Sequence, residues 1–200
     1  MHDIIYIFER KLLVGIINSK KMDKKVIHLF GASGSGTTTL GRFMADHLNA
    51  FFMDTDDYYW ESVDPPYTVK RAIPDRLKLI KSDLAEHECS VLSGSLVNWG
   101  DELIPQFTLA IRVVTDSAVR LDRLRAREYA HFGSRIEPGG DMYEQHQKFI
   151  EWASSYDTGG VEIRSKAMHD EWQKLLKCPL VTVDGSLPLE TNWEFIKQYL

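Results

Sequence analysis

The fold is decided by the stretch Gly31-Ala32-Ser33-Gly34-Ser35-Gly36-Thr37-Thr38-Thr39, which directly follows an apolar run at residues 26–30. Phosphate-binding loops between a buried strand and a helix follow the pattern G-x-x-x-x-G-K-[ST]. Gly31 and Gly36 have the spacing of the two glycines, and Thr38 stands at the position of the final hydroxyl. Thr37 stands at the position of the lysine, so the loop lacks its usual positive charge.

The loop still predicts phosphate binding, because glycines let successive backbone N–H groups turn inward around an anion. A helix that follows the loop adds the unpaired N–H groups of its first turn. In the pattern, the hydroxyl after the lysine holds Mg²⁺, a role that falls to Thr38. The residues expected to bind the nucleotide are Gly31, Ser33, Gly34, Ser35, Gly36, Thr37, Thr38 and Thr39.

Apolar runs and stretches of helical period alternate along the rest of the chain. Further strands are expected at residues 51–53, 90–93, 109–114 and 180–183. Helices are expected at residues 38–48, after Pro74, after Asp116, and at residues 141–154, 161–177 and 191–200. This alternation predicts an α/β fold with a five-stranded parallel sheet that is covered on both faces. In such sheets, ligands bind at the carboxyl ends of the strands.

Composition narrows the classes of function. The 200 residues suit one domain, and a hydrophobic fraction of 44% is enough for a packed core. A net charge of −5 argues against nucleic acid as a partner, because duplex binding needs a basic face. The two cysteines, Cys89 and Cys178, supply neither a metal-ligand spacing nor a disulfide framework, so we expect a reducing, cytoplasmic location.

Residues 1–21 are expected to be an extension that precedes a single domain at residues 22–200. Their apolar runs are interrupted by Glu9, Arg10 and Lys11 and are too short to span a membrane. A start codon placed too far upstream would explain the extension. The alternative is a helix or strand that packs on the domain.

The loop and the residues after it resemble the opening of shikimate kinase and the wider group of small P-loop kinases, which act on nucleosides, nucleotides and metabolites. The resemblance is carried by residues 36–42, Ala45, Leu48, Phe52 and Asp54-Thr55-Asp56. It extends from about Val26 to Leu200, loosely beyond Asp57. It implies a three-layer α/β/α fold with a helical lid at about residues 128–160, and ATP and Mg²⁺ as cofactors. These kinases have lysine at the position of Thr37.

An acidic cluster of Asp54, Asp56 and Asp57 follows the second expected strand. Phosphoryl transfer needs one carboxylate to orient the attacking hydroxyl and another to help hold Mg²⁺. Asp54 and Asp56 resemble the D-x-D of shikimate kinase, and the run that continues into Tyr58 and Tyr59 resembles uridine-kinase-like enzymes. Both aspartates are candidate catalytic residues, and Thr38 and Asp56 are candidate metal ligands. A solvated acidic loop is the alternative.

Arginines recur with helical period after the fourth expected strand. Arg120, Arg123 and Arg127 are predicted to share one helix face. Arg123 and Arg127 resemble the arginine pair that opens the lid of adenylate kinase, which makes them candidates for stabilising the transferring phosphate. Arg135 and Arg164 are further lid candidates. The alternative is a solvated basic face that pairs with neighbouring acids.

The sequence thus predicts ATP- and Mg²⁺-dependent phosphoryl transfer to a nucleoside, a nucleotide or a shikimate-like metabolite. A nucleotide-binding sensor or regulatory protein with weak or no catalysis is the alternative, motivated by Thr37 and by the plain sequence Ser93-Gly94-Ser95. The expected partners are a nucleotide and a small-molecule acceptor, without nucleic acid or membrane. The oligomeric state stays open.

Overall fold

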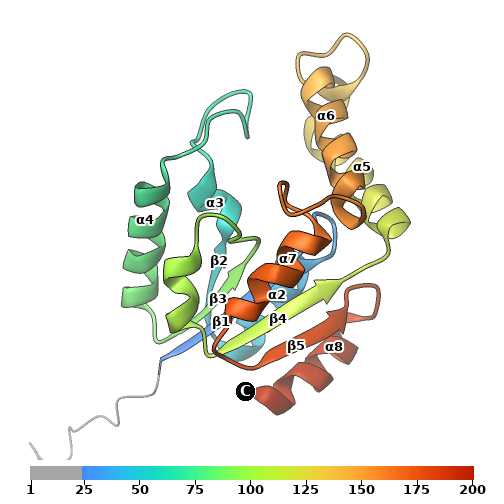
Figure 1. The fold of residues 1–200 in the computed structure, drawn as a ribbon. Helices are drawn as coiled ribbons and strands as arrows, with labels where there is room; N and C mark the ends of the chain where they lie inside the picture. The colour runs from blue at the N-terminus through green and yellow to red at the C-terminus, as the bar shows by residue number, and fades with distance from the viewer. Residues whose placement is uncertain (1–23) are drawn as a thin grey trace, which may run out of the picture.

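A five-stranded, all-parallel sheet forms the centre of the molecule (Figure 1). The computed structural model describes residues 24–200, so the prediction for residues 1–21 lies outside the described chain. The strands run in the order β2-β3-β1-β4-β5. They are β1 (Lys25–Gly31), β2 (Phe51–Asp54), β3 (Cys89–Ser93), β4 (Leu109–Val114) and β5 (Leu180–Asp184). The predicted α/β fold with a five-stranded parallel sheet is confirmed.

Helices cover both faces of this sheet and extend beyond one edge. They are α2 (Thr37–Leu48), α3 (Thr55–Tyr59), α4 (Ile73–Glu86), α5 (Ser117–Phe132), α6 (Tyr143–Ser154), α7 (Lys166–Trp172) and α8 (Leu189–Ile196). Short 3₁₀ turns are η1 (Asp101–Gln106), η2 (Gly133–Ile136), η3 (Ser155–Asp157), η4 (Gln173–Leu175) and η5 (Lys197–Tyr199). α2 and α8 pack on one face, and α4, η1 and α7 pack on the other. α5 and α6 project past the carboxyl edge of the sheet (Figure 1).

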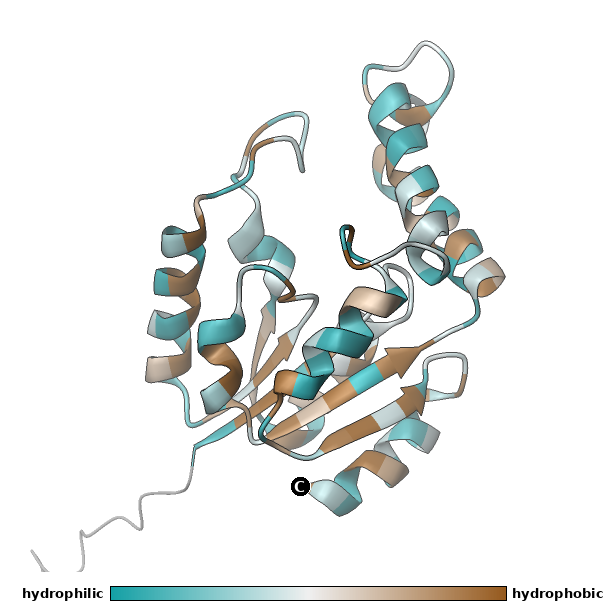
Figure 2. Ribbon diagram, in the orientation of Figure 1, coloured by the Kyte–Doolittle hydropathy of each residue, from teal (hydrophilic) through white to brown (hydrophobic). Residues whose placement is uncertain are grey.

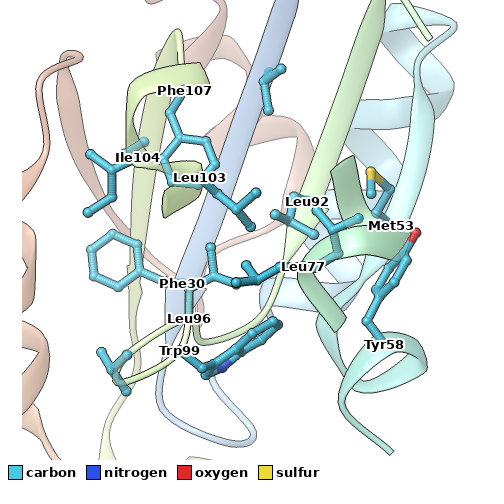
Figure 3. Packing of buried hydrophobic residues seen from close by; sticks show 14 of the residues in the cluster. Phe30, Met53, Tyr58, Leu77, Leu92, Leu96, Trp99, Leu103, Ile104 and Phe107 are labelled. Carbon is cyan, nitrogen blue, oxygen red and sulfur yellow. The ribbon is translucent and has the colours of Figure 1, made fainter. Parts of the chain in front are cut away.

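The two faces of the sheet form separate apolar clusters, because successive strand residues point to opposite sides. Phe30, Met53 and Leu92 pack with Leu77 and Trp99 in one cluster (Figure 3). The other cluster joins alternate residues of the same strands to α2 and α8. Hydropathy follows this arrangement, since the strands are largely hydrophobic and the outer faces of the helices are hydrophilic (Figure 2).

The last third of the chain differs from the sequence-based expectation. The helix predicted at residues 161–177 is confined to α7 and the turn η4, and residues 158–165 are turns and bends. Ser165 ends this irregular stretch, because its Oγ accepts a hydrogen bond from the Met168 N–H and so caps α7. The short elements α3 and η1 also escaped prediction, since five or six residues carry too little periodicity to read.

A histidine lies at the centre of the sheet. His28 is fully buried on β1, stacks on Phe107 with 4.8 Å between ring centroids, and contacts the Leu92 carbonyl through Nδ1 at 3.1 Å. Burial lowers the pKa of His28 to about 4, against 6.5 for the free side chain. Burial likewise lowers the pKa of His169 on α7 to about 3. Both imidazoles are therefore neutral in the folded protein at pH 7.

These histidines make stability depend on pH. The unfolded chain binds a proton at His28 below pH 6.5, whereas the folded chain binds it only near pH 4, so stability falls as the pH drops through this range. The variant His28→Phe keeps the ring and removes this proton. In urea unfolding between pH 6 and pH 5, its stability should fall less steeply than that of the wild type, by about 1.4 kcal/mol per pH unit. Identical slopes would contradict the assignment.

Candidate functional site

The phosphate-type loop connects β1 to α2. Gly34 and Gly36 have φ values of 78° and 101°, which side chains rarely adopt. A Cβ on Gly34 would also lie 2.6 Å from the Arg120 backbone oxygen, so glycine is required there. Gly36 is the residue before α2 and has no side chain to cap the helix. The first N–H groups of α2 are consequently left for a ligand.

The other predicted loop residues surround this turn. Gly31 ends β1, and Ser33 and the buried Ser35 lie within the loop. The Ser35 carbonyl accepts a hydrogen bond from the Thr115 hydroxyl at 2.9 Å, which ties the loop to the end of β4. Thr37, Thr38 and Thr39 form the first turn of α2, and Thr39 is exposed. The eight residues predicted to bind nucleotide are therefore contiguous around the glycine turn.

Asp54 links this loop to the acidic cluster. Its Oδ2 accepts a hydrogen bond from the Thr38 hydroxyl at 3.1 Å, and its Oδ1 accepts one from the Asp56 N–H at 3.1 Å. The second bond caps α3. A hydroxyl beside a carboxylate is an oxygen ligand set that suits Mg²⁺. The structure thus brings Thr38 together with Asp54, whereas the sequence prediction had paired Thr38 with Asp56.

Asp56 is exposed on α3 but lies among other charged groups. Desolvation by the surrounding protein raises the pKa of its carboxyl, and the negative charge of Asp54 adds to this. Arg164, Arg127 and a hydrogen bond from the Trp60 side chain oppose the rise in the Asp56 pKa. The pKa of the neighbouring Asp57 is raised by the same two causes, desolvation first. A carboxylate with a raised pKa is a better proton acceptor.

Arg120 follows the predicted helical spacing with Arg123 and Arg127 on α5, but unlike them it is buried and does not belong to a solvated face. Its side chain is 1% exposed and donates to the carbonyls of Thr115 at 3.1 Å and Ser33 at 3.4 Å. It also forms an ion pair with Asp157. Arg120 is buried because α5 packs its first turns against the loop, and Gly34 leaves room for that approach. Arg120 therefore supports the loop through its hydrogen bond to the Ser33 carbonyl.

Arg123 and Arg127, the two arginines of α5 that were candidates for phosphate contact, are exposed. Arg123 donates to the Gly185 carbonyl at 3.0 Å. A Cβ placed on Gly36 would lie 3.8 Å from Arg123 Nη1 and 3.9 Å from the Gly185 carbonyl oxygen, so both groups lie beside the glycine turn. Arg127 forms an ion pair with Glu128 at 3.1 Å and acts electrostatically on Asp56. Arg123 therefore lies at the loop, and Arg127 lies on the side of the acidic cluster.

Arg164, from the irregular stretch before α7, reaches the loop directly. Its Nη2 donates to the Ser33 hydroxyl at 2.6 Å, and its guanidinium stacks over the Trp152 ring at 4.3 Å from the centroid. Trp152 belongs to α6. No local pattern predicts these contacts, because Ser33 and Arg164 are separated by 131 positions.

Arg135 lies elsewhere, near the tip of the α5–α6 pair. It forms ion pairs with Asp141 at 2.7 Å and with Asp64 at 2.9 Å. Close by, the Gln145 side chain donates to the Pro66 carbonyl at 3.0 Å. These contacts connect the α5–α6 pair to the segment between α3 and α4. Arg135 is thus placed at a link between two projecting segments and not at the loop.

Gly94, just after β3, was passed over as a site residue. Its φ is 118°, and a Cβ would lie 1.8 Å from the Thr55 Oγ1. Thr55 directly follows Asp54, so Gly94 lets the end of β3 approach the acidic cluster. The signal in the sequence was a glycine at a strand end, which alone does not reveal the contact.

Comparison with known proteins places the chain among relatives. It is 41% identical over 177 residues to the Bacillus subtilis (strain 168) protein YqaC, which is described as uncharacterized, and the match covers 88% of this chain and 98% of YqaC. This chain belongs to the YqaC family. No protein-family model matches it.

Solved structures extend the comparison to the fold. A shikimate kinase from Bacteroides thetaiotaomicron matches with a TM-score of 0.52 and 17% identity, over 87% of this chain and 97% of that one. A candidate kinase from Chloroflexus aurantiacus matches with a TM-score of 0.52 and 16% identity, over 89% and 99%. The YqaC relative described here therefore has a P-loop kinase fold. Between residues 24 and 200, none of its helices has both the length and the hydropathy that a membrane crossing requires.

The buried position of Arg120 predicts a structural penalty for its loss. The variant Arg120→Met leaves two carbonyls and Asp157 without their donor, so the free energy of unfolding should fall by about 2–3 kcal/mol. Arg125, which is exposed and pairs with Asp122, provides a matched control. The change Arg125→Met should cost at most about 0.5 kcal/mol. Equal urea midpoints for the two variants would contradict the supporting role of Arg120.

Proposed function

We propose that this YqaC relative catalyses ATP- and Mg²⁺-dependent phosphoryl transfer to a hydroxyl group of a small molecule. The observation that carries the proposal is the hydrogen bond between Thr38 and Asp54. It joins the first turn after the phosphate-type loop to the acidic cluster, so the groups for the donor and for the acceptor adjoin one another. A parallel sheet brings them together because β1 and β2 end at the same edge.

The residues present fit both cofactors. The positive-φ glycines and the open first turn of α2 suit the phosphates of ATP, and the Thr38 hydroxyl with the Asp54 carboxylate suits Mg²⁺. When bound, MgATP supplies the transferable phosphoryl group, and the cation offsets charge on the phosphate oxygens. Thr38 and Asp54 would hold the metal directly or through water. Arg123, at the glycine turn, is positioned to contact the nucleotide.

Asp56 is the carboxylate that we assign to the acceptor. Both oxygens of Asp54 are engaged, one by Thr38 and one by the Asp56 N–H, so Asp54 serves the metal side. The pKa of the Asp56 carboxyl is raised, chiefly by desolvation, and the charges of Arg164 and Arg127 act on it. It would orient the acceptor hydroxyl and take its proton as the oxygen attacks. Arg127 would offset negative charge on this side.

The surroundings of Asp56 favour a nucleoside among the three acceptor classes. Trp60 and Tyr67 lie 6.0 Å apart beside it and offer ring faces. The nearby cation Arg71 is already bound to the Asp57 and Tyr58 carbonyls and to Glu61. Arg71 therefore holds its own segment, and the groups that would recognise an acceptor through its ring are Trp60 and Tyr67.

A sensor without catalysis is the second candidate. Thr37 removes a charge from the loop, and Ser93-Gly94-Ser95 adds no carboxylate at the end of β3. This candidate requires ATP or ADP binding without transfer to any acceptor. A phosphorylated product in a broad screen of metabolites, detected by mass spectrometry, would eliminate it.

Asp56→Asn tests the proposed mechanism. It removes the proton acceptor and keeps the shape of the side chain, so kcat should fall by about 10²–10⁴-fold while ATP still binds. Asp57→Asn is the matched control, because it deletes the neighbouring charge and should change kcat far less. Phosphate transfer and ATP affinity by calorimetry are the measurements. Comparable rates for Asp56→Asn and wild type would remove Asp56 from the mechanism.

A thermal-shift screen tests the acceptor class. A ligand that binds only the folded protein raises its stability by RT ln(1 + [L]/Kd), which is about 2.7 kcal/mol at a hundredfold excess over Kd. With Mg²⁺ and a non-hydrolysable ATP analogue present, nucleosides should raise the melting temperature. Nucleoside monophosphates and shikimate should raise it less. A larger shift with either of these would overturn the assignment to nucleosides.

A further inference from the structure

We infer that Arg164 supplies the positive charge that the phosphate loop lacks at Thr37, by binding the terminal phosphates of the nucleotide. The inference rests on the proposed nucleotide binding. It adds the residue whose charge would strengthen the binding of phosphates in this chain. Its starting point is the hydrogen bond from Arg164 Nη2 to the Ser33 hydroxyl at 2.6 Å. This bond places a guanidinium at a loop that has no cation of its own.

The guanidinium of Arg164 is incompletely paired. Within residues 24–200, its Nε–H is buried without a hydrogen-bond partner, and it forms no salt bridge. Burial lowers the pKa of Arg164. Arg164 as a whole is half-buried, but its enclosed Nε–H would normally find an acceptor, because an unpaired buried polar group is costly. An anion that enters the loop would satisfy donors that the protein leaves open.

Two buried arginines of the same region have their guanidinium groups paired within the protein. Arg112 donates to Asp170 and to Gln173, and Arg120 donates to Asp157 and to two carbonyls. Each has a carboxylate partner within the protein. The buried Arg76 has no carboxylate partner either, but its Nε donates to the Arg71 carbonyl. Arg164 differs from all three because its buried Nε–H has no partner, which is why we assign it to a ligand and not to the support of the fold.

The position of Arg164 also matches the proposed reaction. The guanidinium contacts Ser33 of the loop, and the negative charge of Asp56 favours the charged form of Arg164. Asp56 is the group assigned to the acceptor. A cation at the donor loop that also interacts electrostatically with the acceptor carboxylate is suited to offset the negative charge that phosphoryl transfer concentrates. Arg164 can therefore contribute to binding and to rate.

Neighbouring residues fix the guanidinium in this position. The Arg164 Cζ lies 4.3 Å from the centroid of the Trp152 ring, and the negative face of this ring attracts the guanidinium cation. The next residue, Ser165, is fully buried, donates to the Gly160 carbonyl at 2.6 Å and caps α7. The backbone of Arg164 is thus held on one side and its head group on the other. Such preorganisation reduces the entropy lost on binding.

Moving the charge tests the inference. Isothermal titration with MgATP, and separately with inorganic triphosphate, is made on wild type, Arg164→Met, Thr37→Lys and the double variant. Arg164→Met should weaken both ligands by about 10- to 100-fold, the loss of one charge-assisted hydrogen bond. The same change in the Thr37→Lys background should cost much less, because the lysine restores the charge. Arg125→Met, an exposed charge on α5, should leave both affinities unchanged.

The melting temperature separates a binding role from a structural one. Removing an incompletely paired buried charge should leave the nucleotide-free protein as stable as wild type or more stable. If Arg164→Met does not fold, Arg164→Lys replaces it and should bind MgATP with intermediate affinity. Wild-type affinity in either variant, or equal losses with and without Thr37→Lys, would overturn the inference.

The same experiment separates this inference from the proposed function. A wild-type protein that binds neither MgATP nor triphosphate would contradict both. A wild type that binds and transfers phosphate, together with an Arg164→Met variant that does so equally well, would overturn only the role of Arg164. A wild type that binds without transfer still tests Arg164 through its affinities and favours the sensor.

Discussion

The hydrogen bond between Thr38 and Asp54 is the contact on which the site depends, because it connects two strand–helix units that are separate in sequence. One unit is β1 with its glycine loop and α2, and the other is β2 with α3. β3 lies between β1 and β2 in the sheet, so the two carboxyl ends are not direct neighbours. Because Gly94 has no side chain, the end of β3 can closely approach Thr55, the residue next to Asp54.

The loop itself is held by residues from distant parts of the chain. Arg120 binds the Ser33 carbonyl, Thr115 binds the Ser35 carbonyl, and Arg164 binds the Ser33 hydroxyl. Backbone carbonyls that point away from the anion side need such donors, since the N–H groups of the same loop are turned toward the ligand. The conformation of the loop therefore depends on residues from the end of β4, from α5 and from the stretch before α7, as well as on its own glycines.

Local patterns made the fold predictable, and long-range contacts limited the prediction of the site. Runs such as residues 26–30 and the spacing of Gly31 and Gly36 report on short-range geometry, so the strands, α2 and the loop could be read from sequence. Helical period placed Arg120 on the same face as Arg123, but period says nothing about what covers the first turns of a helix. The burial of Arg120 depends on how α5 packs on the loop. The reach of Arg164 depends on a chain path that no local signal encodes.

Placing the loop's positive charge on a residue outside the loop changes what controls binding. A lysine inside the loop would be present at the phosphates whatever the rest of the molecule does. Arg164 instead stacks on Trp152 of α6, and the α5–α6 pair is joined to the segment between α3 and α4 through Arg135 and Gln145. In the proposed arrangement, the charge at the loop is therefore tied to the position of α6 and to the segment that leads toward the acceptor. The Arg164 guanidinium is thus positioned by tertiary contacts, whereas a lysine at position 37 would be positioned by the loop backbone alone.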